Sequence, residues 1–396
     1  SITNLASTAT TINHRGDFGS AGVTNTFNYA TSAAATVTYN NDSASEDISN
    51  TSTTFSNVSN LTVAADDGSV FTEYGWDLGS LAGGTALGTL TLTTGSDVGD
   101  TLSTGDITAA NLETWTITAD DSNLTVGAFA GAGELKTLTI NNTNTASLGD
   151  ITVGAIGATT AADELTAFSV TTLGTADAGG ATVVDMATLD AAGATFTFAM
   201  NLQGNYGSSD IDTVTATSVS SIDIDTGTLG TTLTVDNFDV SGDVGNVDIN
   251  VGDGFEGADA FIDAAGLDVG NFSLTSRALA LNIADADDES SITTATTVGD
   301  VTLVASAAAA SIDLGRFDAA TTVGAISFTG TGSITWDGAA AATTVGNISG
   351  SVAASETVDL TAEDANSLIG AASGTVGTTT VTGAGTFNVD FGAATT

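Results

Sequence analysis

Apolar and polar residues alternate in short runs that recur along most of this chain. In the stretch LKTLTI, Leu138 and Ile140 alternate with Thr137 and Thr139. A period of two residues predicts a β-strand with one buried face, and the Val, Ile, Thr and Phe residues of these runs suit a pleated sheet. Comparable runs begin at Val58, Leu87, Leu112, Leu135, Leu165, Val219, Val244, Val269, Val298, Val323, Val345 and Val376.

The runs are spaced regularly. Most neighbouring starts lie 22 to 31 residues apart, and the region 189–198 fills the wider gap between Leu165 and Val219. In most repeats a second alternating run follows the first, as in SNLTVGAF, ASIDLGRF, GSITWDGA and GTFNVDFG. Short clusters of Gly, Asn, Asp and Ala separate the runs, as turns require. A period in this range indicates a repeat architecture.

Two or three short strands cannot bury an apolar face alone, whereas stacked repeats can. We therefore predict an all-β fold: a right-handed parallel β-solenoid (β-helix) of roughly 12 to 14 coils over residues 56–396, with a rise of about 4.8 Å per coil. An array of β-sandwich domains is the alternative. Hairpin signals are sparse, which favours the solenoid; they are Asp67-Gly68, Asp253-Gly254 and Asp337-Gly338.

Residues 1–55 do not show the repeat. They contain two of the four Tyr residues and the single His, His14. This block is short for a domain that folds on its own. We predict that it is an N-terminal cap, an assembly arm or an irregular first coil.

Charge narrows the classes of partner. The 396 residues include 47 acidic side chains and four basic ones, Arg15, Lys136, Arg277 and Arg316, and the formal net charge is −43. Nucleic-acid binding is excluded because the chain lacks the cations that displace condensed counterions, and an anionic membrane surface is disfavoured. No apolar run approaches the length of a spanning helix, so membrane insertion is not expected. The few basic residues are expected to pair with carboxylates.

Composition also bears on location. The chain has no Cys, no Pro and one Lys, and it is rich in Thr, Ala, Gly and Asp. This composition favours an extracellular or cell-surface protein over a cytosolic protein of a halophile, which would be expected to keep Pro, Glu and helices. The first residue is Ser, which fits a processed secreted protein and a fragment equally well.

These Lys-poor, Cys-free coils rich in Thr, Ala, Gly and Asp resemble bacterial surface-layer proteins and related β-solenoid surface structural proteins, in composition and in repeat pattern. The resemblance implies a protein that forms lattices or fibres outside the cell, often with calcium. The calcium-binding nonapeptide GGxGxDxUx does not occur in the chain.

Acidic clusters beside turns are the candidate metal ligands. Ca²⁺ takes roughly six to eight oxygen ligands, and stacked coils would bring Asp residues to about 5 Å from one another, where a cation relieves their repulsion. A solvated acidic turn is the alternative for each cluster. The candidates are Asp97, Asp100, Asp106, Asp236, Asp239, Asp243, Asp248, Asp253, Asp285, Asp287, Asp288 and Glu289.

Enzymatic activity is not expected, and no residue is assigned a catalytic role. Polysaccharide-cleaving β-helices need cations to hold an anionic substrate or a developing charge, and four basic residues over 396 positions are too few. We expect a self-assembling extracellular structural protein, a surface-layer or filament subunit that polymerises through solenoid ends and strand edges. The alternatives are a monomeric adhesin stalk or fibre module and, least favoured, a polysaccharide-active enzyme.

Two further expectations concern what the chain carries. Ca²⁺ is the one cofactor predicted. Surface glycans are expected where N-x-[ST] sequons occur, at Asn41, Asn50, Asn57, Asn60, Asn123, Asn141, Asn271 and Asn347.

Overall fold

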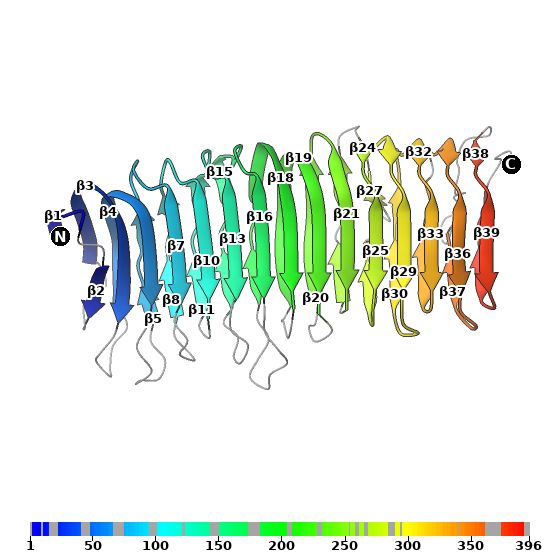
Figure 1. Ribbon diagram of the computed structural model, residues 1–396, viewed down its shortest axis with the longest axis horizontal. Helices are drawn as coiled ribbons and strands as arrows, with labels where there is room; N and C mark the ends of the chain where they lie inside the picture. Colours follow the sequence, from blue (N-terminus) through cyan, green and yellow to red (C-terminus); the bar gives the residue numbers. More distant parts are fainter. Residues whose placement is uncertain are drawn as a thin grey trace. The chain divides into compact units, whose positions relative to one another are not determined.

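The computed structural model is all-β, and its parallel strands stack in successive turns as a β-solenoid (Figure 1). The parallel β-solenoid is confirmed, because a β-sandwich array would be built from antiparallel strands; the stack has about 11 turns, fewer than the roughly 12 to 14 coils expected. Among the described residues, no helix is long and apolar enough to cross a membrane. The structure describes residues 2–8, 11–15, 23–40, 48–65, 75–94, 101–120, 123–142, 150–172, 183–203, 208–227, 232–252, 254–257, 261–264, 268–283, 290–293, 295–339, 341–360 and 374–391.

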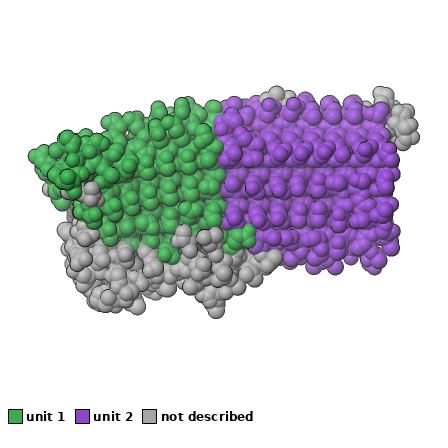
Figure 2. All heavy atoms as spheres, viewed as in Figure 1, with its two compact units in different colours: residues 1–194, 202–209 green, residues 195–201, 210–396 purple. Residues whose placement is uncertain are grey.

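The chain divides into two compact units, which Figure 2 shows in different colours. Unit 1 comprises residues 1–194 and 202–209, and unit 2 comprises residues 195–201 and 210–396. Strands β18 (Leu189–Leu202) and β19 (Ser209–Thr226) contribute residues to both units.

The remaining strands of unit 1 are β1 (Ile2–Leu5), β2 (Thr11–Arg15), β3 (Val23–Asn40), β4 (Ile48–Ala65), β5 (Gly75–Asp77), β6 (Ser80–Ala82), β7 (Thr89–Thr94), β8 (Thr101–Thr104), β9 (Ile107–Thr108), β10 (Thr114–Ala119), β11 (Asn123–Val126), β12 (Phe129–Gly131), β13 (Thr137–Asn142), β14 (Ile151–Val153), β15 (Ile156–Thr160), β16 (Ala167–Thr172) and β17 (Val184–Met186). One ladder of paired strands runs through β2, β3, β4, β7, β10, β13 and β16. A second ladder runs through β4, β5, β8, β11, β14 and β17.

The remaining strands of unit 2 are β20 (Thr232–Val240), β21 (Val244–Val251), β22 (Gly254–Gly257), β23 (Ile262–Ala264), β24 (Asp268–Val269), β25 (Phe272–Ser276), β26 (Ala280–Asn282), β27 (Ser290–Ile292), β28 (Thr297–Val298), β29 (Val301–Ala305), β30 (Ser311–Leu314), β31 (Arg316–Phe317), β32 (Thr322–Val323), β33 (Ile326–Gly330), β34 (Ser333–Trp336), β35 (Thr344–Val345), β36 (Ile348–Val352), β37 (Thr357–Asp359), β38 (Thr375–Val376), β39 (Thr379–Gly383) and β40 (Thr386–Asn388). One ladder runs through β19, β21, β25, β29, β33, β36 and β39, and another through β20, β22, β26, β30, β34, β37 and β40.

The sequence repeat sets the register of the sheet, because equivalent residues of successive repeats pair with one another. The Val residues that begin successive runs in unit 2 pair with one another, from Val219 through Val244, Val269, Val298, Val323 and Val345 to Val376. The predicted spacing of 22 to 31 residues is therefore the length of one coil. The second runs of the repeats form the separate ladder that contains β30 and β34.

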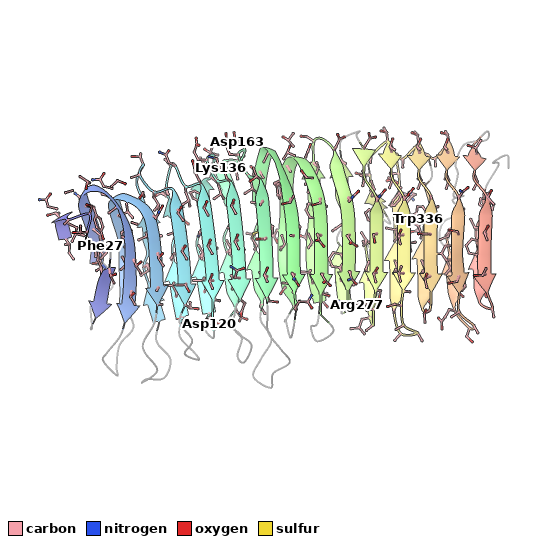
Figure 3. All side chains as sticks on the ribbon, viewed as in Figure 1. Phe27, Asp120, Lys136, Asp163, Arg277 and Trp336 are labelled. Carbon is pink, nitrogen blue, oxygen red and sulfur yellow. The ribbon has the colours of Figure 1, made fainter. Side chains whose placement is uncertain are left out.

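Alternation along the strands divides core from surface. In β7, β10 and β13 every second side chain is buried and the others are partly exposed. Each fully buried Leu or Ile contributes about 1.5–3 kcal/mol. Aromatic side chains fill the interior: Trp115 packs edge-on against Phe129 at 5.7 Å between ring centroids, and Trp336 lies 5.0 Å from Phe317. Figure 3 marks Trp336 in unit 2, where its side chain is fully buried.

The sheet does not begin at residue 56. Within the block 1–55, β2 pairs in parallel with β3, and β3 pairs with β4 over a long stretch that includes Val37 opposite Val63. The described residues of this block therefore share ladders with the coils that follow. A role for the block as a cap or an assembly arm stays a prediction.

Candidate functional site

Five of the predicted metal ligands lie within the described residues. Asp106 belongs to unit 1, and Asp236, Asp239, Asp243 and Asp248 belong to unit 2. The remaining candidates lie outside the described residues: Asp97, Asp100, Asp253, Asp285, Asp287, Asp288 and Glu289.

Some carboxylates of unit 2 stack in successive coils, as predicted. Asp223 on β19 is opposite Asp248 on β21, and Asp239 on β20 is opposite Asp263 on β23. Adjacent parallel strands lie about 4.8 Å apart, so each pair holds two negative charges close together. For Asp223, repulsion from Asp248 favours the protonated acid.

Asp223 and a nearby acid of unit 2, Asp236, have a pKa raised above the ordinary value of Asp. Partial burial raises the pKa of Asp223, and the charges of Asp248 and Asp225 add to the effect. Partial burial, together with the charge of Asp212, raises the pKa of Asp236. In both cases the fold disfavours the charged carboxylate, so a bound cation or proton would relieve unit 2.

A complete metal site is not formed by the part of the chain that the structure describes. Within it, no group of three or more His, Cys, Asp or Glu side chains is placed to hold a metal ion. A pair such as Asp223 and Asp248 offers two carboxylates, whereas Ca²⁺ takes roughly six to eight oxygens. Calcium binding stays a prediction.

Two of the predicted ligands have a structural partner instead. Asp243 Oδ1 accepts a hydrogen bond from the backbone N–H of Asp268 in the next coil, at 3.1 Å. Asp106 Oδ1 accepts one from the N–H of Ala128 in the next coil of unit 1, at 3.2 Å. These carboxylates tie one coil to the next at a corner.

The same bond recurs along one corner of unit 2. Asn246 Oδ1 accepts from the N–H of Asn271 at 3.0 Å, Asn271 Oδ1 from Asp300 at 3.1 Å, and Asp300 Oδ1 from Ala325 at 2.8 Å. Asn347 Oδ1 accepts from the N–H of Thr378 at 2.9 Å. We call the four acceptors Asn246, Asn271, Asp300 and Asn347 the corner ladder. It satisfies backbone donors at a bend, where strand pairing is interrupted.

Glycines precede the corner ladder and let the coils approach. A Cβ on Gly270 would lie 2.8 Å from a backbone atom of Gly245, and a Cβ on Gly324 would lie 2.7 Å from one of Gly299. The column continues through Gly346 and Gly377. Sequence reasoning used the Val of each Val-Gly-Asn or Val-Gly-Asp triplet and missed the role of the two residues after it. The signal was present, because these triplets recur at the coil spacing.

Basic residues pair with acids, as expected from their scarcity. Lys136 Nζ lies 2.9 Å from Glu113 Oε1, and this hydrogen bond raises the pKa of Lys136. Arg277 Nη2 donates to Asp225 Oδ1 at 3.2 Å and to the carbonyl of Thr226. Arg316 pairs with Asp318. Figure 3 marks Lys136 in unit 1 and Arg277 in unit 2.

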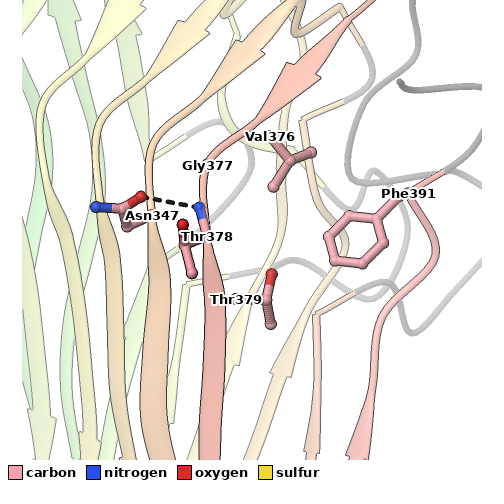
Figure 4. A pocket seen from close by; sticks show the side chains of 6 residues that line it. All are labelled: Asn347, Val376, Gly377, Thr378, Thr379 and Phe391. Carbon is pink, nitrogen blue, oxygen red and sulfur yellow. Dashed lines mark hydrogen bonds between the residues drawn. The ribbon is translucent and has the colours of Figure 1, made fainter. Parts of the chain in front are cut away.

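Two open grooves of unit 2 are lined by described residues alone. One, of about 410 Å³, follows the corner between successive coils and is lined by Thr195, Ser218, Val219, Ser220, Asp243, Val244, Gly245, Asp268, Val269 and Gly270. The other, of about 540 Å³, lies against the last described coil and is called the terminal groove (Figure 4). It is lined by Asn347, Val376, Gly377, Thr378, Thr379 and Phe391.

The terminal groove combines a sheet edge with apolar side chains. In Figure 4 Val376 and Phe391 flank the groove, and the bond from Thr378 to Asn347 fixes its wall. No protein-family model matches the chain, and comparisons with curated proteins and with solved structures found no match either. The fold and these surfaces are therefore the features that bear on function.

Proposed function

We propose that this chain is an extracellular structural protein that assembles with copies of itself, as the subunit of a surface layer or of a cell-surface filament. The β-solenoid fold itself is compatible with a structural or adhesin-like role. The proposal adds self-assembly and location, and the last described coil of unit 2 supports the first of these.

The observation that carries the proposal is the exposure of apolar side chains in that coil. Val345 and Val323 are 2% and 1% exposed, whereas their ladder partner Val376 is only half-buried. Val358 is fully buried, whereas its partner Phe387 is half-buried. Another coil stacked here, either a further coil of this chain or a coil of a second copy, would bury these side chains as the interior coils bury theirs.

The backbone of the same coil offers a second driving force for assembly, an unpaired strand edge in the described part of the chain. β39 pairs with β36, and within the described residues it has no second neighbour in that ladder. An unpaired strand edge is a template for another strand, and an added strand gains main-chain hydrogen bonds. A contact between two different surfaces of identical subunits propagates as a ring or a filament.

Charge sets the conditions for such assembly. Copies that each carry a net charge of −43 repel one another, and salt screens this repulsion with a Debye length of about 8 Å at physiological ionic strength. Assembly is therefore expected to need salt or a divalent cation. The predicted Ca²⁺ would act by neutralising carboxylates between subunits.

Electron microscopy of the purified chain tests the proposal. Negative-stain images would be taken at neutral pH with millimolar Ca²⁺, and again after chelation. Filaments or sheets are the expected result. Their loss on chelation would support calcium bridging, and their persistence would keep the structural function while removing calcium from it. Single particles under both conditions would contradict self-assembly and favour the adhesin alternative.

A pair of matched variants locates the contact. Val376→Asp places a charge on the exposed face of the last described coil and is expected to abolish assembly. Thr329→Asp adds the same charge at an exposed position on β33, within the stack, and is expected to leave end-to-end assembly intact. Equal loss of assembly in both variants would show that added charge alone is responsible, and that the terminal groove is not the contact.

A further inference from the structure

One face of unit 1 carries a regular array of threonines. Its members are the outward-facing residues of three neighbouring strands: Thr89, Thr91 and Thr93 on β7, Thr114, Thr116 and Thr118 on β10, and Thr137, Thr139 and Asn141 on β13. We call these nine residues the threonine grid. Eight of them are Thr, and the grid follows from the alternation predicted from sequence.

The grid is periodic in two directions. Across the strands Thr116 is directly opposite Thr91 and Thr139, without a shift in register, and this spacing is about 4.8 Å. Along a strand, residues two apart lie about 6.6 Å from one another. The central column extends to Thr62 on β4 and Ser169 on β16. The outcome is a lattice of hydroxyl and methyl groups.

Buried side chains and strand pairing also hold the threonine grid in a fixed position. Trp115 and Ile117, between the outward threonines of β10, are fully buried, and neighbouring strands are bonded along their length. Thr is β-branched and stiff at χ1, so its hydroxyl and methyl groups keep fixed directions. A rigid backbone and stiff side chains keep the lattice spacing constant.

The grid is uncharged, although the chain carries a net charge of −43. Charged neighbours lie at the strand ends: Glu113 and Lys136 precede β10 and β13 and pair with each other, and Asp120 follows β10. The corresponding strands of unit 2 differ, because β19 and β21 present Asp223, Asp225 and Asp248 on their outward faces. Later strands of that ladder, β25, β29 and β33, are again uncharged on their outward faces, but Ser and Val interrupt the threonine rows there.

We propose that the threonine grid is an ice-binding surface. Its repeat of about 4.8 Å across the strands is close to one spacing between water oxygens on the lateral faces of hexagonal ice, and its repeat of about 6.6 Å along the strands is somewhat shorter than the other. Hydroxyls hydrogen-bond the waters of such a layer, and the methyl groups between them restrict the orientation of neighbouring waters. A periodic, rigid and uncharged face can match a crystal of water over many contacts at once.

A flat crystal is favoured over other occupants. A small molecule needs a concave site with a few converging polar groups, whereas the grid lies along regular strands. A stable contact with a second copy would be expected to have aromatic or apolar anchors at its centre, and the grid has neither. Ice binding is independent of the self-assembly proposed above, so either proposal can fail alone.

Thermal hysteresis and ice recrystallisation of the purified full chain test the inference. The wild-type chain is expected to lower the freezing point below the melting point, to facet growing ice crystals and to slow recrystallisation. Thr116→Lys puts a long charged side chain at the centre of the grid, so most of the hysteresis should be lost. Thr125→Lys is the matched control, because Thr125 is an exposed residue of β11, in a different ladder of unit 1.

Circular dichroism of both variants shows whether they keep the wild-type fold. Loss of hysteresis in Thr116→Lys with retention in Thr125→Lys supports the grid. Absence of hysteresis in the folded wild-type chain overturns the inference, as does an equal loss in both folded variants. Sedimentation velocity supplies a third readout: if the wild-type chain self-associates and Thr116→Lys alone removes the association, the grid is an interface between copies.

Discussion

Gly299 stacks directly on Gly270 of the preceding coil, because a Cβ added to Gly299 would lie 2.8 Å from the carbonyl carbon of Gly270. Two of the three nearest atoms belong to the Gly270 backbone and cannot turn aside, and the third, Asn271 Oδ1 at 2.7 Å, is held by its hydrogen bond from the Asp300 N–H. Overpacking of this kind costs about 1–3 kcal/mol. We predict that Gly299→Ala lowers the free energy of unfolding by about that amount, measured by urea denaturation followed by circular dichroism.

Gly131→Ala is the control for that substitution. A Cβ at Gly131, at the end of β12, would meet no atom within 4 Å. Its stability is expected to stay within about 0.5 kcal/mol of wild type, since an Ala also reduces the freedom of the unfolded chain. Equal losses in the two variants would show that the stacked glycines are not special.

The corner ladder predicts that one substitution destabilises the chain and that another stabilises it. Asn271→Ala removes the acceptor of the Asp300 N–H and should cost about 1 kcal/mol, the net value of one hydrogen bond. Ala325 occupies the equivalent position in its coil but has no side-chain oxygen. Ala325→Asn should therefore stabilise the chain by supplying an acceptor for the backbone N–H of Asn347. Urea midpoints at constant slope would measure both. A destabilised Ala325→Asn would contradict the proposed register of the ladder.

The sequence predicted the strands and the register, because both follow from periodic patterns, but it did not predict which atoms of neighbouring coils meet at the bends. Alternation within a run identifies strands such as Thr137–Asn142, and the recurrence of Val298 and Val323 identifies the register. The contact between Gly270 and Gly299 joins residues 29 positions apart at a bend, and no local pattern shows which atoms meet there. The need for glycine at these positions follows only from the stacking of one coil on the next.

Two of the acidic candidates have a structural role that the sequence did not reveal, for a related reason. Proximity to a Gly turn suggested metal ligands, yet the oxygens of Asp106 and Asp243 are used by backbone N–H groups of the next coil. A carboxylate near a turn satisfies either a cation or a backbone donor. The sequence does not distinguish these roles, because the donor lies in another coil.

Asp223 makes the stability of unit 2 depend on pH. Its pKa is raised in the fold, chiefly by burial and further by Asp248 and Asp225. The folded state therefore binds this proton more tightly than the unfolded state does, so stability rises as pH falls through the raised pKa and levels off below the ordinary range of Asp. Asp223→Asn should raise the melting temperature at pH 7 and flatten this rise.

The comparison for Asp223→Asn is a charge change elsewhere on unit 2. Asp268→Asn alters an exposed side chain at the corner groove, and it is expected to change the melting temperature less at pH 7. Thermal melts from pH 7 to pH 4 would be recorded for both. If the two variants give the same profile, net charge alone governs the pH dependence.

Arg277 joins coils that are two repeats apart. Its Nη2 donates to Asp225 Oδ1 and to the carbonyl of Thr226, 52 and 51 residues earlier in the chain. The side chain is 35% exposed, so solvent weakens the ion pair, and Arg277→Ala should cost about 1 kcal/mol. Arg277→Lys should recover part of this loss, because an ammonium keeps the charge but lacks the planar fork.

Lys136→Ala is the comparison, because it removes the more exposed pair with Glu113. It should cost less than Arg277→Ala, and its effect should disappear in 1 M salt as screening predicts. Urea denaturation at low and high salt separates the two cases. The cross-coil contact of Arg277 would be contradicted if its loss were as salt-sensitive as that of Lys136.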